Sequence, residues 1–238
     1  MQVALVTGAS QGFGHALSEG LVEQGWSLVI DARDGEALAG ADLALRAGLS
    51  PGANLVAVAG DVTDPAHRNA LVQACEDLGG MDLLVNNASL LGPTPLPHLA
   101  DYSIDDLRRV LEVDTVAPLA LTQQALEQLR RSANPRVLNI TSDASVEHYE
   151  GWGGYGSAKA ALDHLSLTLG VEEPGVRVWV VDPGDMRTAM HQEAFPGEDI
   201  SDRPLPSAVV PAFLALIGGE LPSGRYRAAE LSSTRAPA

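Results

Sequence analysis

Val6-Thr7-Gly8-Ala9-Ser10-Gln11-Gly12-Phe13-Gly14 places three glycines between a short apolar run, Gln2–Thr7, and a helical pattern, His15–Gln24. Glycine allows a positive φ angle and a close approach of the backbone, and the free N–H groups at a helix N-terminus bind phosphate. A strand, a glycine-rich turn and a helix in this order are typical of a dinucleotide-binding domain. The turn therefore predicts a cofactor site that contains Gly8, Ser10, Gln11, Gly12, Phe13 and Gly14.

Outward from this turn, apolar strand patterns alternate with helical patterns. Continuous apolar runs indicate strands buried on both faces, and strands separated by helices indicate a parallel sheet with right-handed crossovers. We predict an α/β fold: a single doubly wound Rossmann domain, with a parallel seven-stranded sheet and helices on both faces. The expected strands are Gln2–Thr7, Ser27–Ala32, Asn54–Ala59, Met81–Asn86, Pro135–Ser142, Val176–Val181 and an edge strand at Arg225–Ala229.

No linker, charge block or repeat divides the chain, so residues 1–238 are expected to form one domain. A long helix is predicted over Ser103–Arg131, with a bend at Pro118. After Gly184 the alternation loosens, and residues 185–206 are expected to form a substrate loop with short helical turns. Residues from about 233 to 238 are expected to form a flexible tail. The other expected helices are Glu36–Leu45, Pro65–Leu78, one that carries Tyr155, and Ser207–Ile217.

The overall charge restricts the class of partner. The formal net charge is −16, which argues against nucleic acid or an anionic membrane as a partner. The single cysteine, Cys75, cannot form an internal disulfide, and the histidines show no metal-ligand clustering, so no metal site is expected. The chain shows no leader pattern and no apolar run of about 18 residues, so we expect a cytoplasmic protein.

Lys159 is the only lysine in the chain, beside 14 arginines, and it follows Tyr155 by four residues. Residues four apart lie on one face of a helix, so the ammonium group can lie beside the phenol. An adjacent cation favours the phenolate and lowers the pKa of a tyrosine, which makes it a usable general acid or base. The pair therefore predicts a catalytic tyrosine assisted by lysine.

The end of the second strand determines whether the protein binds the adenosine ribose of NAD or that of NADP. Its sequence is Ile30-Asp31-Ala32-Arg33-Asp34. An acidic residue here would hold the 2′-hydroxyl of NAD, whereas an arginine would accept the 2′-phosphate of NADP. We expect Arg33 to bind that phosphate, so NADP(H) is favoured and NAD(H) stays possible. Arg33 as an ordinary solvated loop residue is the alternative.

These segments together resemble the short-chain dehydrogenase/reductase family, in its compact single-domain branch. The resemblance extends from residue 3 to about residue 190. Its motifs are Thr7–Gly14, Gly60-Asp61-Val62, Asn86-Asn87-Ala88, Ser142 thirteen residues before Tyr155, Tyr155 to Lys159, and Pro183-Gly184 with Thr188.

The resemblance implies a role for each motif. Tyr155 would protonate the substrate oxygen as hydride arrives, Lys159 would assist it and bind the nicotinamide ribose, and Ser142 would donate a hydrogen bond to the same oxygen. The remaining residues would bind the cofactor. Asp61 and Val62 would hold the adenine, Asn87 and Ala88 would line the groove, and Pro183, Gly184, Met186 and Thr188 would hold the carboxamide.

Two residues depart from the family pattern. Asp114 stands where the family commonly has asparagine in the fourth helix, at a kink that holds a proton-relaying water. Its carboxylate would add a charge near Lys159 and could shift the pH dependence, or it could be a tolerated isostere, so Asp114 joins the catalytic candidates. Ser89 follows Ala88 where glycine is usual.

We expect an NADP(H)-dependent oxidoreductase that reduces ketones or aldehydes, or oxidises secondary alcohols, in the manner of a carbonyl reductase. The alternative is a catalytically reduced nucleotide-binding regulatory or assembly subunit. The resemblance implies a homodimer or homotetramer built on the fourth and fifth helices. Tyr149 and Trp152 could line an aromatic substrate pocket or simply pack the loop before Tyr155.

Overall fold

The computed structural model describes residues 1–233. In this part of the chain, seven parallel strands form one sheet in the order β3-β2-β1-β4-β5-β6-β7. The predicted α/β fold is confirmed, with β7 at the edge. The strands are β1 (Val3–Val6), β2 (Ser27–Ala32), β3 (Leu55–Ala59), β4 (Leu83–Asn86), β5 (Arg136–Ile140), β6 (Arg177–Asp182) and β7 (Gly224–Arg227).

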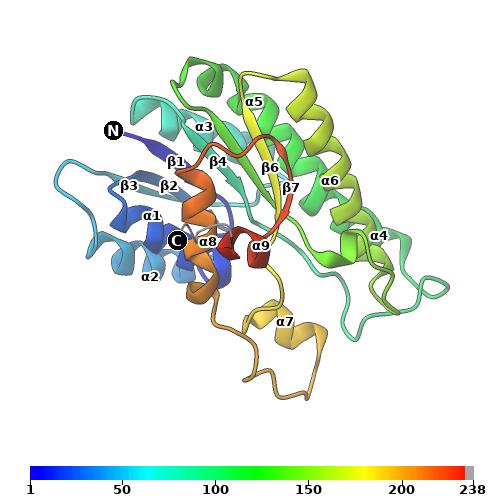
Figure 1. Ribbon diagram of the computed structural model, residues 1–238. Helices are drawn as coiled ribbons and strands as arrows, with labels where there is room; N and C mark the ends of the chain where they lie inside the picture. Colours follow the sequence, from blue (N-terminus) through cyan, green and yellow to red (C-terminus); the bar gives the residue numbers. More distant parts are fainter. Residues whose placement is uncertain (234–238) are drawn as a thin grey trace.

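Helices cover both faces of the sheet (Figure 1). One group comprises α1 (Gly12–Glu23), α2 (Gly35–Arg46) and α8 (Pro206–Ile217), and the other comprises α3 (Pro65–Asp77), α5 (Ala117–Arg131) and α6 (Gly153–Glu172). Successive strand residues point to opposite faces. In β1, Ala4 and Val6 therefore belong to the first apolar core and Val3 and Leu5 to the second, which explains why the strands are apolar throughout.

The long helix predicted over Ser103–Arg131 is interrupted. It consists of α4 (Ile104–Leu111), a π-helical turn (Glu112–Val116) and α5. The irregularity lies directly before Pro118, in the turn that a proline disturbs, because proline offers no N–H to that turn and its ring crowds the carbonyl group four residues earlier. The irregularity expected at Pro118 thus takes the form of a π-helical turn, whose middle residue is Asp114.

The ends of several strands also differ from the prediction. The strand expected to reach Ser142 ends at Ile140, because Ser142 caps a short 3-10 helix, η2 (Asp143–Ser145). The expected edge strand ends at Arg227, and α9 (Ala228–Ser233) follows it. The predicted flexible tail, apart from Ser233, lies outside the described residues.

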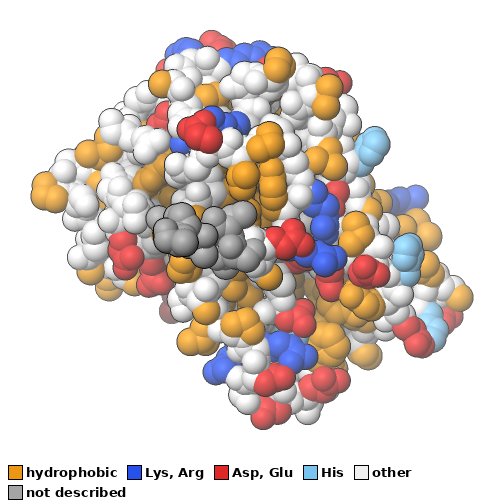
Figure 2. Space-filling view, viewed as in Figure 1, with side chains coloured by type: hydrophobic (Ala, Val, Ile, Leu, Met, Phe, Trp, Pro, Cys, Tyr) orange, Lys and Arg blue, Asp and Glu red, His pale blue; other side chains and the backbone are white. Residues whose placement is uncertain are grey.

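Residues 185–206 form a lobe below the carboxyl edge of the sheet, and α7 (Ala189–Ala194) is its helix (Figure 1). The predicted loop with a short helical turn is therefore confirmed. Acidic and basic side chains mix over this lobe (Figure 2), and Arg203 forms ion pairs with Asp185 and Asp202. Among residues 1–233, no helix has the length and apolarity that crossing a membrane requires.

Candidate active site

A cavity of about 1090 Å³ lies along the carboxyl edge of the sheet, where α/β folds bind ligands. It brings together residues from the glycine-rich turn, several strand ends, the start of α6 and the α7 lobe. Gly14 and Asp114 are the two predicted site residues that do not line it. Those that do are Gly8, Ser10, Gln11, Gly12, Phe13, Arg33, Asp61, Val62, Asn87, Ala88, Ser142, Tyr155, Lys159, Pro183, Gly184, Met186 and Thr188.

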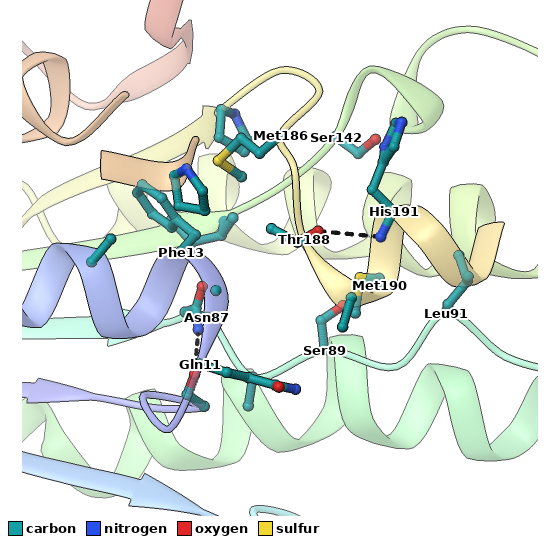
Figure 3. A pocket seen from close by; sticks show the side chains of 18 of the residues that line it. Gln11, Phe13, Asn87, Ser89, Leu91, Ser142, Met186, Thr188, Met190 and His191 are labelled. Atoms are coloured by element: carbon teal, nitrogen blue, oxygen red, sulfur yellow. Dashed lines mark hydrogen bonds between the residues drawn. The ribbon is translucent and has the colours of Figure 1, made fainter. Parts of the chain in front are cut away.

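The glycine-rich turn packs directly on the end of β4. Gly8 has a φ of +65°, and a Cβ there would lie 2.8 Å from Cα of Ala88. Asn87 Nδ2 donates to the carbonyl oxygens of Thr7 and Gly8, at 2.8 and 3.1 Å (Figure 3). A Cβ on Gly14 would collide with the Asn87 amide. Gly14 therefore permits this packing and does not line the cavity, and its contact with a cofactor stays a prediction.

The first turn of α1 suits a diphosphate. Gln11 is the N-cap residue, but its side chain makes no capping hydrogen bond, and no acidic residue lies in the first turn. The N–H groups there are left to an anion, which the positive end of the helix dipole also favours. Gly12, with a φ of +59°, adds no side chain to this part of the cavity.

At the end of β2, the two acidic residues are hydrogen-bonded within the protein, whereas the arginine is exposed. Asp31 is 1 % exposed, and its carboxylate accepts from Gly8 N at 2.8 Å and pairs with His67 Nε2 at 2.9 Å. Asp34 caps α2 through the backbone N–H groups of Glu36 and Ala37. Both carboxylates already have protein partners, whereas Arg33 is exposed at the cavity. This end of the cavity therefore favours a ribose that carries a 2′-phosphate over a ribose with a free 2′-hydroxyl.

Asp61 stands at the same end of the cavity. Its Oδ1 accepts from the backbone N–H and the hydroxyl of Thr63, at 2.9 and 2.8 Å. Partial burial opposes ionisation, but these hydrogen bonds and the charges of Arg33 and Arg109 outweigh it and lower the pKa of Asp61. Asp61 is thus held as a carboxylate acceptor beside buried Val62.

Ser142 is positioned by η2 and by β7. Its hydroxyl accepts from Ala144 N at 3.2 Å and donates to Asp143 Oδ1 at 3.0 Å. Its carbonyl oxygen accepts from the Arg225 guanidinium at 3.1 Å. Because a hydroxyl hydrogen can rotate, Ser142 can turn its donor from Asp143 to a ligand oxygen in the cavity.

Tyr155 and Lys159 lie on one face of α6, as predicted from their spacing. Lys159 is 2 % exposed, its Nζ lies 5.4 Å from the centroid of the Tyr155 ring, and it donates to the carbonyl oxygen of Ile140 at 3.1 Å. A buried ammonium beside a buried phenol can organise a proton transfer at the phenol oxygen. The lone lysine is therefore part of the cavity and not a residual surface charge.

The predicted effect of Lys159 on Tyr155 needs correction. Burial raises the pKa of Tyr155, and the carboxylate of Asp114 raises it further, while a hydrogen bond with Ser89 acts in the opposite direction. Burial of the phenol and the negative charge of Asp114 thus oppose the predicted effect of the lysine on this pKa. In this structure the pKa of Tyr155 is therefore raised, not lowered.

Asp114 lies behind the cavity, fully buried in the π-helical turn. Its carboxylate accepts from Leu90 N at 2.8 Å and from the Ser89 hydroxyl at 3.1 Å. Burial raises the pKa of Asp114, while Lys159 and the two hydrogen bonds partly oppose this. The two residues that depart from the family pattern, Ser89 and Asp114, thus contact each other next to Tyr155.

The segment after β6 forms the other end of the cavity. Gly184, with a φ of +76°, donates its backbone N–H to Asp182 at 2.9 Å, which fixes the turn at Pro183. Met186 is buried under this turn, and the Thr188 hydroxyl caps α7 by accepting from His191 N at 3.2 Å (Figure 3). The segment predicted to bind the carboxamide therefore lines the cavity, and its role stays a prediction.

The sequence left the substrate side of the cavity largely unassigned. Trp152, one of the two aromatic residues left open, lies against Tyr155 and Phe195, with ring centroids 5.9 and 6.0 Å apart. Leu91, Met190 and His191 also line this side. Met190 and His191 lie in the predicted substrate loop, residues 185–206, but the sequence did not single them out. Within residues 1–233 no cluster of histidine, cysteine or carboxylate groups could hold a metal ion.

The chain is similar to known oxidoreductases in sequence. A family model described as short chain dehydrogenase matches residues 2–199. The chain is 38% identical over 197 residues to the rhamnolipids biosynthesis 3-oxoacyl-[acyl-carrier-protein] reductase of Pseudomonas aeruginosa, covering 79% of this chain and 74% of that protein. It is 33% identical over 202 residues to the sepiapterin reductase of Rattus norvegicus, covering 81% and 77%.

The fold has close matches among solved structures. A short chain dehydrogenase from Shigella flexneri 2a, solved in complex with NADP, superposes with a TM-score of 0.89. The two chains are 25% identical, and the match covers 96% of this chain and 97% of the other.

Proposed function

The chain belongs to the short-chain dehydrogenase/reductase family, and from that premise we propose that it is an NADP(H)-dependent oxidoreductase acting on ketones, aldehydes or secondary alcohols. One observation carries this function: Ser142, Tyr155 and Lys159 line the same cavity as the glycine-rich turn. A reacting carbonyl would therefore lie between two hydroxyl groups and beside a bound nicotinamide.

NADP is the cofactor that the residues fit. Asp31 and Asp34 are engaged by backbone and side-chain donors, and exposed Arg33 supports binding of a 2′-phosphate. The complex of the Shigella flexneri neighbour with NADP supports the same cofactor here. The uncapped first turn of α1 would hold the diphosphate, and the segment from Pro183 to Thr188 would hold the carboxamide.

The bound cofactor would supply or accept the hydride, and side chains of the protein would transfer the proton. During reduction, Tyr155 gives its phenolic proton to the substrate oxygen as negative charge develops there. Ser142 donates a hydrogen bond to the same oxygen and stabilises that charge. Lys159, held by the carbonyl oxygen of Ile140, supports the phenolate that remains. In the reverse direction Tyr155 removes the proton of the alcohol.

Replacing Tyr155 by phenylalanine tests this function. Loss of the general acid should lower kcat by about 100-fold or more, measured as NADPH oxidation with a panel of ketones and aldehydes. NADPH binding, followed by fluorescence, should persist. Tyr226→Phe is the matched control, because Tyr226 lies on β7 outside the cavity and its hydroxyl donates to the carbonyl oxygen of Pro222, before that strand.

The same experiment discriminates between the enzyme and the nucleotide-binding subunit. If the wild type and Tyr155→Phe were equally inactive on every carbonyl compound while both bound NADPH, the proposed catalytic function would lose its support.

We further propose a cytoplasmic homodimer or homotetramer. Exposed apolar side chains on the long α6 helix, Leu167 and Val171, support such an assembly.

A further inference from the structure

His191 has a buried polar atom that the mechanism above does not use. Its side chain is 10 % exposed and projects from α7 into the cavity. Nε2 is buried and has no hydrogen-bond partner within residues 1–233. An unpaired buried polar atom is costly, so one that lines a ligand cavity points to a partner on the ligand.

The ring is held in one orientation by its surroundings. His191 N donates to the Thr188 hydroxyl at 3.2 Å, and the ring packs against Phe195 with centroids 4.9 Å apart. Nδ1 faces Asp185 Oδ1 at 3.9 Å. In Figure 3 the ring extends from α7 in the direction of the Ser142 side chain. His191 and Ser142 thus line the same cavity, in which the reacting carbonyl would lie.

The charge of Asp185 beside the ring bears on which ligand group can form a hydrogen bond with Nε2. Nδ1 faces the Asp185 carboxylate, and the tautomer with its hydrogen on Nδ1 has a lone pair on Nε2. The neighbouring lining residues Leu91, Met190 and Phe195 are apolar, and neither the Trp152 indole nor any other donor of the described residues bonds to Nε2. A hydroxyl group on a bound substrate could supply the missing donor.

We propose that His191 is a substrate-binding residue whose Nε2 accepts a hydrogen bond from a hydroxyl group next to the reacting carbonyl, which makes hydroxy ketones the preferred substrate class. This inference rests on the proposed function. It adds a second polar anchor to an otherwise apolar substrate side, and sites of this kind discriminate strongly against analogues that leave the anchor unpaired.

Three aryl ketones of one skeleton test the inference: α-hydroxyacetophenone, α-methoxyacetophenone and acetophenone. The wild type should reduce the hydroxy ketone with a kcat/KM about tenfold or more above that of acetophenone. The methoxy compound, which has the oxygen but no donor, should show no such advantage. Equal kcat/KM values for the hydroxy and methoxy compounds would overturn the inference.

His191→Phe keeps a ring against Phe195 and removes both nitrogen atoms. The ratio of kcat/KM values between the hydroxy ketone and acetophenone should fall to near one in this variant. His148→Phe is the matched control: His148 is exposed, does not line the cavity, and its replacement should leave the ratio as in the wild type. Melting curves and NADPH titration establish that both variants are folded and bind cofactor.

The outcomes separate the two proposals. Reduction of all three ketones without a hydroxyl preference, or a preference that survives in His191→Phe, would overturn the role of His191 and leave the proposed function intact. A wild-type protein that binds NADPH and reduces no carbonyl compound would overturn the proposed function, and this inference with it.

Discussion

At the scale of single residues, Asp31 and Arg33 show how neighbours in sequence take opposite roles. Asp31 is buried and bonded to Gly8 and His67, and burial, partly opposed by these two partners, raises the pKa of its carboxyl group. Arg33 is two residues further on and exposed at the cavity. The acidic residue thus bonds to the glycine-rich turn, while the basic one stays exposed where we propose that the cofactor binds.

Arg33→Ala should reduce the preference for NADPH over NADH. Loss of a charge-assisted contact to the 2′-phosphate should raise the KM for NADPH about tenfold or more and leave the KM for NADH nearly unchanged. Steady-state kinetics with both cofactors measure this. Arg109→Ala is the control, since Arg109 also acts on Asp61 by its charge but does not line the cavity. An equal KM change for both cofactors would contradict the assignment.

Asp114 acts on the tyrosine through its charge. Because that carboxylate raises the pKa of Tyr155, Asp114→Asn should lower it. Alcohol oxidation needs the phenolate as base, so its rate rises as the pH passes the pKa of Tyr155. We therefore expect this rise in the pH–rate profile of kcat to move to lower pH in the variant. An unchanged profile would mean that the substitution for asparagine is a tolerated isostere.

At the scale of elements, the close contact between α6 and η2 fixes two proposed catalytic residues relative to each other. Tyr155 lies on α6, and Ser142 caps η2. Gly156 lies on α6 one residue after Tyr155, and a Cβ there would lie 2.5 Å from the carbonyl oxygen of Ala144. That oxygen belongs to backbone that cannot move independently of Ser142. The distance between the Ser142 and Tyr155 hydroxyls therefore depends on a glycine outside the catalytic group.

Gly156→Ala should separate α6 from η2 and lower kcat by about tenfold or more, because a small misplacement of catalytic groups costs rate. Gly153→Ala is the matched control on the same helix. Its Cβ would meet only the side-chain end of Leu99, which is exposed and can move. Kinetics and melting temperatures of the two variants measure the difference. Equal activities would show that the contact is not needed for alignment.

At the scale of the whole molecule, two apolar cores hold the sheet while its carboxyl edge carries the chemistry. The cores bury the alternate side chains of each strand, so the strand ends are fixed relative to one another. The formal charge of −16 does not prevent an anionic cofactor from fitting, because Arg33 and the first turn of α1 supply local positive potential. Local geometry, not net charge, determines this site.

The sequence by itself determined the fold class, the glycine-rich turn and the pairing of Tyr155 with Lys159. These depend on local periodicity and spacing, which act over a few residues. Pro118 signalled an irregularity in the long helix, because a proline disturbs the turn that precedes it. The form of that irregularity, a π-helical turn around Asp114, has no signal in the hydrophobic periodicity and was seen only in the structure.

Only the tertiary structure decided which polar groups are free to act. It engages Asp31 and Asp34 and leaves Arg33 exposed, it raises the pKa of Tyr155 by burial and by Asp114, and it leaves Nε2 of His191 unpaired at the cavity. The partners in these interactions are distant in sequence, as with Asp31 and His67 or Asp114 and Tyr155. Burial and long-range charge arise only when the chain is folded, so no local pattern can encode them.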